Sequence, residues 1–110
     1  MKFTINDKVY EGAKYDMNTH CLFEEYKTDV LLIQKQPLSV LRAYLSISSG
    51  MDLDEAGKEI EAHIIKGGKL EDISKALLTE MDQSDFFLAM VGGKKKPAKA
   101  TKKNEDDTEV

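Results

Sequence analysis

The chain has 110 residues, a net charge of −4 and one cysteine. Its length suits one domain with a single core, and its 41% share of apolar residues is typical of a globular chain. It lacks the run of about 18 apolar residues that spans a membrane, and we expect no signal peptide because the first residues include no apolar stretch. One cysteine excludes an internal disulfide, so the expected location is the cytosol.

A change in composition at Gly92 divides the sequence. Residues 92–110 contain one aliphatic residue larger than alanine, Val110. Such a polar segment cannot bury enough apolar surface to offset its ordering entropy. The sequence therefore predicts a domain over residues 1–91 and a disordered tail over 92–110, first Lys-rich and then acidic. Because the tail has six lysines and four acidic residues, the domain carries a net charge of −6. This acidity argues against nucleic acid as the main partner, since phosphate binding depends on Lys and Arg.

The N-terminus is expected to form a β-hairpin. Asn6 and Asp7 both tolerate the left-handed backbone angles that a two-residue turn requires. Pairing around this turn places Phe3 opposite Tyr10, on the same face as Ile5. Because an isolated hairpin is marginally stable in water, this face must pack on a helix.

Four or five helices are expected after the hairpin, each with one apolar stripe. The first begins after an N-cap at Asp16 and runs either as one helix or as two pieces divided near residues 28–29. The sequence thus predicts a mainly α domain, in which an N-terminal β-hairpin is followed by a small bundle of four or five helices. The further helix boundaries are marked by Pro37, Gly50, Asp52 with Glu55, and Gly67-Gly68. The apolar stripes of the four main helices, in chain order, are Leu22, Tyr26, Val30 and Ile33; Leu38, Leu41 and Leu45; Leu53, Ala56, Ile60 and Ile64; and Leu70, Ile73, Leu77 and Met81.

The sequence shows no arrangement of residues that indicates catalysis. His20 and Cys21 are adjacent, and neighbouring residues on a helix point about 100° apart, which is poor geometry for a nucleophile–base pair or for two ligands of one metal. Asp52 and Glu55 are better explained by helix capping than by calcium binding. We therefore expect a non-enzymatic protein with no catalytic, cofactor-binding or metal-binding residues.

An apolar run immediately before the tail is the candidate binding segment. It has two interpretations. The run either folds back to close the core or forms a partly exposed docking surface for another protein, because patches rich in aromatic residues and Met mark interfaces. Both states can alternate, with the segment closed in the free protein and open in a complex. The candidate partner-binding residues are Phe86, Phe87, Leu88, Met90 and Val91.

The order of these elements resembles the tail assembly chaperones of long, non-contractile-tailed bacteriophages and related prophages. The resemblance covers residues 1–91. It implies a chaperone that acts in the host bacterial cytoplasm, binds the tape-measure protein, helps recruit tail-tube subunits and is absent from the mature virion. It rests on the opening Met-Lys-Phe-Thr-Ile-Asn-Asp-Lys-Val-Tyr-Glu, on Lys-Gly-Gly-Lys-Leu-Glu-Asp-Ile at residues 66–73 and on Asp-Phe-Phe at residues 85–87.

The resemblance also implies that the protein is made in a short form and in a longer form produced by ribosomal frameshifting. Gly-Gly-Lys-Lys-Lys at residues 92–96 permits slippery codons at the required place. The alternative prediction is a small cytosolic adaptor or regulator that binds another protein, with a basic tail that contacts nucleic acid weakly. Self-association is compatible with either prediction, since a small bundle can retain spare apolar surface.

Overall fold

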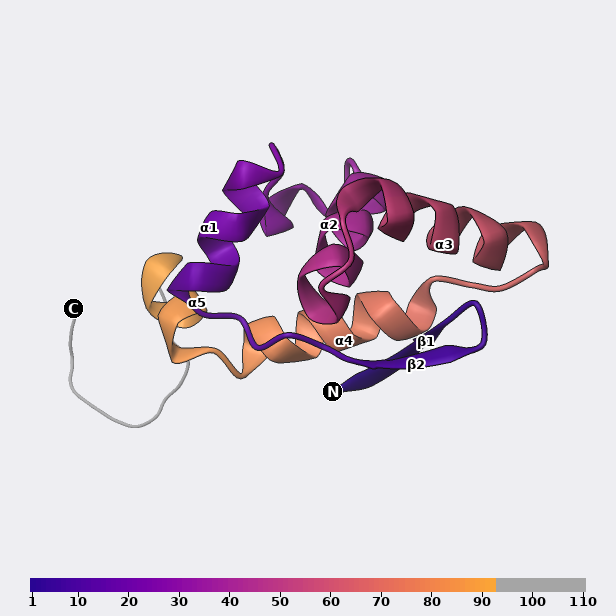
Figure 1. Ribbon diagram of the computed structural model, residues 1–110. Coiled ribbons are helices and arrows are strands. Elements are labelled where there is room, and N and C mark those ends of the chain that lie inside the picture. The colour runs from indigo at the N-terminus through magenta and orange to yellow at the C-terminus, as the bar shows by residue number, and fades with distance from the viewer. Residues whose placement is uncertain (93–110) are drawn as a thin grey trace.

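A computed structural model describes residues 1–92 and shows an N-terminal hairpin followed by a helical bundle (Figure 1). This confirms the predicted mainly α fold. The predicted disordered tail, apart from Gly92, lies outside the described residues. The elements are β1 (Lys2–Ile5), β2 (Lys8–Glu11), α1 (Met17–Glu25), the single 3₁₀ turn η1 (Val30–Leu32), α2 (Pro37–Ser49), α3 (Leu53–Ile65), α4 (Glu71–Asp82) and α5 (Asp85–Met90).

The hairpin has the predicted turn and register. Asn6 and Asp7 adopt φ angles of 52° and 66°, the pair of positive values that a type I′ turn requires. Phe3 pairs with Tyr10, and both Phe3 and Ile5 are buried. The hairpin therefore contributes one apolar face to the core. Strand β1 packs against α3 and α4, and β2 borders α2 (Figure 1).

Helix α2 lies at the centre of the core, and its Tyr44 is fully buried. The ring centroid of Tyr44 lies 5.9 Å from that of Phe3 and 6.4 Å from that of Phe23. Its hydroxyl donates a hydrogen bond to the carbonyl of Ala13 at 2.8 Å. One side chain thus joins the hairpin, α1 and α2. The chain leaving the hairpin passes so close that a Cβ on Gly12 would lie 2.5 Å from Tyr44 Oη.

His63 connects the hairpin turn to the loop between α3 and α4. Its Nδ1 accepts a hydrogen bond from the backbone N–H of Asn6 at 2.9 Å. This fixes the tautomer, so Nε2 donates to the carbonyl of Lys69 at 2.8 Å. A Cβ on Gly68 would come within 2.5 Å of the imidazole ring. The half-buried His63 side chain therefore links α3 to the hairpin turn and to the loop before α4 by hydrogen bonds.

The boundaries of the helices follow the predicted signals. Asp16 accepts a hydrogen bond from Thr19 N–H at 2.9 Å, and Asp52 accepts one from Glu55 N–H at 2.8 Å. These bonds satisfy backbone donors that have no partner within the first turn of a helix. At the other end of α2, Gly50 adopts a φ of 86°, as a left-handed C-cap requires.

The residues of the stripe predicted after Asp16 do not form a single continuous helix. Helix α1 ends at Glu25, Lys27 adopts a φ of 63°, and η1 begins a new segment, so the predicted division into two pieces is the one observed. Within α1, Phe23 is fully buried and Leu22 is half-buried. The larger aromatic ring occupies the core position because it packs against Tyr15 and Tyr44.

Two predicted stripe residues are exposed to solvent. Leu38 in the first turn of α2 is 54% exposed, and Ile64 near the end of α3 is also exposed. Both residues line a groove between α2 and α3, which leaves their side chains open to solvent. The other two residues of the predicted α2 stripe, Leu41 and Leu45, are buried as expected. Four more residues of α2 are buried with them: Val40, Ala43, Tyr44 and Ser46.

Among the helices of residues 1–92, none combines the length and apolar character needed to cross a membrane.

Candidate functional site

The predicted docking segment forms α5 and the residue after it, and it is divided between core and surface. Phe87 is only 8% exposed and belongs to the hydrophobic core. Phe86 and Leu88 are half-buried, whereas Met90 and Val91 are exposed. In the described structure the segment is therefore closed, with the Phe87 side chain packed in the core. Of the five candidate residues in this segment, those with exposed side chains are Met90 and Val91.

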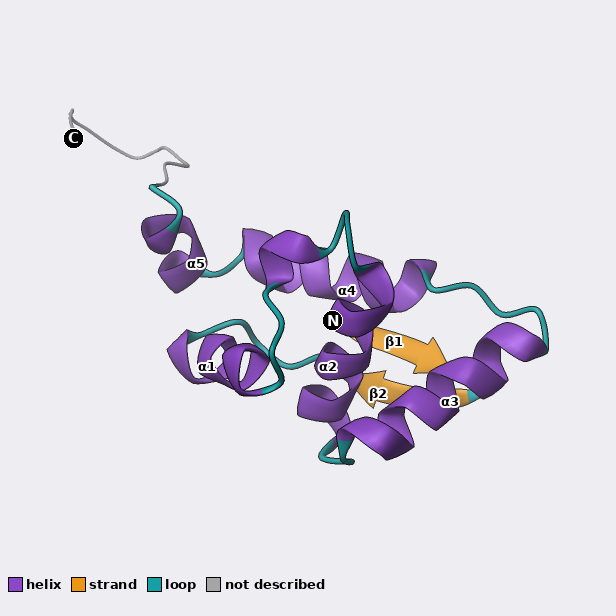
Figure 2. Ribbon diagram, turned by 90° about the horizontal axis from the view of Figure 1, so that it is seen from above, coloured by secondary structure: helices purple, strands orange, loops and turns teal. Residues whose placement is uncertain are grey.

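Contacts with Tyr15 hold α5 in this position, at the same end of the molecule as α1 (Figure 2). The ring centroids of Tyr15 and Phe87 are 5.3 Å apart. The hydroxyl of Ser84 donates to the Tyr15 carbonyl at 2.5 Å and accepts from Phe87 N–H at 2.9 Å. Burial raises the pKa of the Tyr15 phenol, and its hydroxyl hydrogen-bonds to His20 Nδ1. These contacts make α5 part of the folded domain.

The histidines have structural contacts at both ring nitrogens. His20 lies between Tyr15 and Glu24, with 3.2 Å between His20 Nε2 and Glu24 Oε2. His63 is held between Asn6 and Lys69 as described above. Within residues 1–92, no group of three or more His, Cys, Asp or Glu side chains is placed to hold a metal ion.

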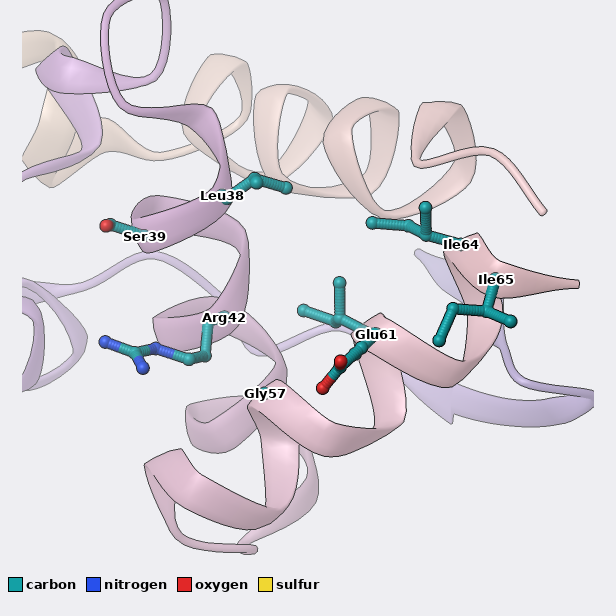
Figure 3. Close-up of a pocket in the computed structure, with 8 residues that line it drawn as sticks. Leu38, Ser39, Arg42, Gly57, Glu61, Ile64 and Ile65 are labelled. Carbon is teal, nitrogen blue, oxygen red and sulfur yellow. The ribbon is translucent and has the colours of Figure 1, made fainter. Parts of the chain in front are cut away.

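A larger apolar surface, not predicted from the sequence, surrounds Leu38. A groove of about 380 Å³ lies between α2 and α3, and Leu38 and Ile64 point toward one another across it (Figure 3). Ile65, which is 77% exposed, also lines the groove. Arg42 from α2 and Glu61 from α3 supply its charged groups. The groove is therefore mainly aliphatic, with one charge of each sign.

A second, more open groove of about 600 Å³ adjoins the first along α2 and α4. Leu38 lines both grooves, so they form one continuous surface across three helices. The exposed Leu78 lies in the second groove, and α5 contributes to neither. We call this region the Leu38 surface and define it by its apolar residues Leu38, Ile60, Ile64, Ile65, Leu70 and Leu78.

The charged residues around the Leu38 surface are balanced and free of internal ion pairs. Three are basic and three are acidic, whereas the domain as a whole carries −6. None of the six forms a salt bridge with any other residue in the range 1–92. These charges are therefore available to a bound partner. They are Arg42, Lys69, Lys75, Glu61, Glu71 and Asp82.

The sequence does carry one signal for this surface. Ile64-Ile65 and Leu77-Leu78 are adjacent apolar pairs in helices. Because neighbouring helical residues point about 100° apart, one member of each pair falls away from the centre of a narrow stripe.

No family model, curated protein or solved structure matches the chain. The exposed surface itself is thus the main basis for a functional proposal.

Proposed function

We propose that this protein is a non-enzymatic tail assembly chaperone of a long, non-contractile-tailed bacteriophage or a related prophage. It acts in the host bacterial cytoplasm, where it binds apolar helical segments of the tape-measure protein until tail-tube subunits replace it. The observation that supports this proposal is the Leu38 surface, on which aliphatic side chains from three helices remain uncovered. The order of the elements, a hairpin followed by a helical bundle, is the one on which the resemblance rests.

The form of the surface favours a helical partner. Grooves between helices accept amphipathic helices, which insert apolar side chains spaced three or four residues apart. The two grooves meet at Leu38 and provide aliphatic walls on both sides. The surrounding charges can then pair with the polar face of the bound helix. Binding of this kind hides the apolar stripe of the client, the tape-measure protein, from water and prevents its premature aggregation.

Leu38→Asp is expected to weaken binding of the tape-measure protein by at least tenfold, on the order of 1.4 kcal/mol, because it places a carboxylate where the two grooves meet. The fold should persist, since Leu38 is 54% exposed. The measurement is co-expression with the tape-measure protein of the encoding phage, followed by quantification of the co-purified complex. Val9→Asp is the matched control because Val9 is a 66% exposed aliphatic residue on β2 that lines neither groove. Equal binding by the two variants would contradict the proposal.

The coding DNA provides a second test. We expect a slippery heptamer across the codons for residues 92–96, followed by an open reading frame in the minus-one register. Mass spectrometry of the products in the host should then detect both a short and a long form. Interrupted codons with no downstream frame would contradict the two-form prediction.

A nucleic-acid binding assay tests the alternative function, a small adaptor or regulator with a basic tail. Binding that falls steeply with salt and disappears on deletion of residues 92–110 would favour this alternative.

A further inference from the structure

We infer that two copies of this chain pair through the α2–α3 groove, with Ile65 of each copy packed against Leu38 of the other. The same patch presents both a projection and a hollow. Ile65 is 77% exposed at the end of α3, and the groove beside it has room for a branched aliphatic side chain. A twofold contact requires such a self-complementary patch, because each copy contributes the same residues.

The distribution of charge favours this face over the rest of the surface. A domain with a net charge of −6 repels a second copy at most orientations. At the groove, however, the charged lining residues are one cation, Arg42, and one anion, Glu61. Both are exposed, and neither forms a salt bridge with a residue in the described part of the chain. A second copy can therefore approach here without net repulsion.

Helix geometry also defines the register of the pair. Leu38 and Arg42 are four residues apart on α2, and Glu61 and Ile65 are four residues apart on α3. Each interval is about one helical turn, so each pair projects from the same face of its helix. When α3 of one copy runs antiparallel to α2 of the other, Ile65 meets Leu38 and Glu61 meets Arg42. The twofold axis repeats both contacts.

Pairing would also regulate access to the groove. If the proposed function holds, a client helix and a second copy compete for Leu38, so the dimer is a resting form that the client dissociates. This consequence rests on the proposed function, whereas the pairing itself does not.

Sedimentation velocity of the full chain over a range of concentrations tests the pairing. We expect the wild type to convert from monomer to dimer as concentration rises, and Ile65→Asp to raise the dissociation constant by at least about tenfold. Leu38→Asp should act in the same direction. Val9→Asp adds the same charge at an exposed aliphatic position outside the groove, so it should leave the dissociation constant unchanged. Circular dichroism should show the wild-type helix content in all variants.

Charge reversal then tests the register. Arg42→Glu and Glu61→Arg should each weaken the dimer, and the double variant should restore it because the ion pairs form with reversed sign. A double variant as weak as the single variants would overturn the proposed register and with it the inference. A wild type that remains monomeric at every concentration would also overturn it. That result would leave tape-measure binding untouched, so failure of the pairing is distinguishable from failure of the proposed function.

Discussion

Phe87→Ala is expected to lower the free energy of unfolding by about 3 kcal/mol, because removal of a buried aromatic ring costs both transfer free energy and a cavity. The ring is 8% exposed and lies 5.3 Å from the ring of Tyr15, centroid to centroid. In a domain of this size the change should lower the melting temperature by roughly 10–20 °C. Thermal and urea denaturation followed by circular dichroism will measure it.

Met90→Ala is the matched control, since Met90 lies in the same helix and is exposed. Its effect should remain within about 0.5 kcal/mol of the wild type. The comparison separates the two interpretations of the segment before the tail. A Phe87→Ala variant with unchanged stability and reduced partner binding would show that Phe87 is a docking residue, and it would contradict the closed arrangement described here.

Local signals were sufficient to predict most of the fold. The turn at Asn6 and Asp7 depends on the backbone preferences of those two residues, and both adopt the expected positive φ angles. The caps at Asp16 and Asp52 likewise depend on hydrogen bonds to residues three positions away. Each of these features is decided within a few residues of sequence, which is why the sequence specifies it.

Burial was predicted less well because it depends on contacts between distant segments. Leu38 and Leu41 belong to the same predicted stripe, yet Leu41 is buried while Leu38 is exposed. Periodicity identifies the face that a residue occupies, but it does not show how far the neighbouring element extends along that face. The same limit applies to Ile64 at the end of α3. The candidate site is formed by such uncovered positions, so it emerged only from the structure.

The aromatic contacts of α5 also depend on the tertiary fold. Phe86 and Phe87 are equally apolar in sequence, and neither periodicity nor composition distinguishes them. In the structure the Ser84 hydroxyl caps α5 and fixes its rotation by bonding to the Tyr15 carbonyl. Tyr15 is 69 residues away from Ser84 in the chain. That long-range bond accompanies the placement of Phe87 in the core beside Tyr15.

Gly12→Ala is expected to lower the free energy of unfolding by about 3 kcal/mol, toward the upper end of the usual cost of overpacking. The added Cβ would lie 2.5 Å from Tyr44 Oη and 2.8 Å from the carbonyl oxygen of Met1. Neither atom moves easily, because Tyr44 donates to Ala13 and the Met1 carbonyl accepts from Gly12 N–H. Gly12 is not among the glycines with positive φ, so the substitution tests close approach alone.

Gly57→Ala provides the contrast, with the opposite sign. Gly57 lies within α3, where alanine is favoured over glycine by up to about 1 kcal/mol, and its added Cβ would meet Arg42 Cδ at 3.3 Å. The Arg42 side chain is exposed and can shift, so urea denaturation should show a gain in stability.

In a Tyr44→Phe background, where Oη is absent, Gly12→Ala should lower the free energy of unfolding by less than it does in the wild type. An equal cost in both backgrounds would mean that the phenol does not limit the space at Gly12.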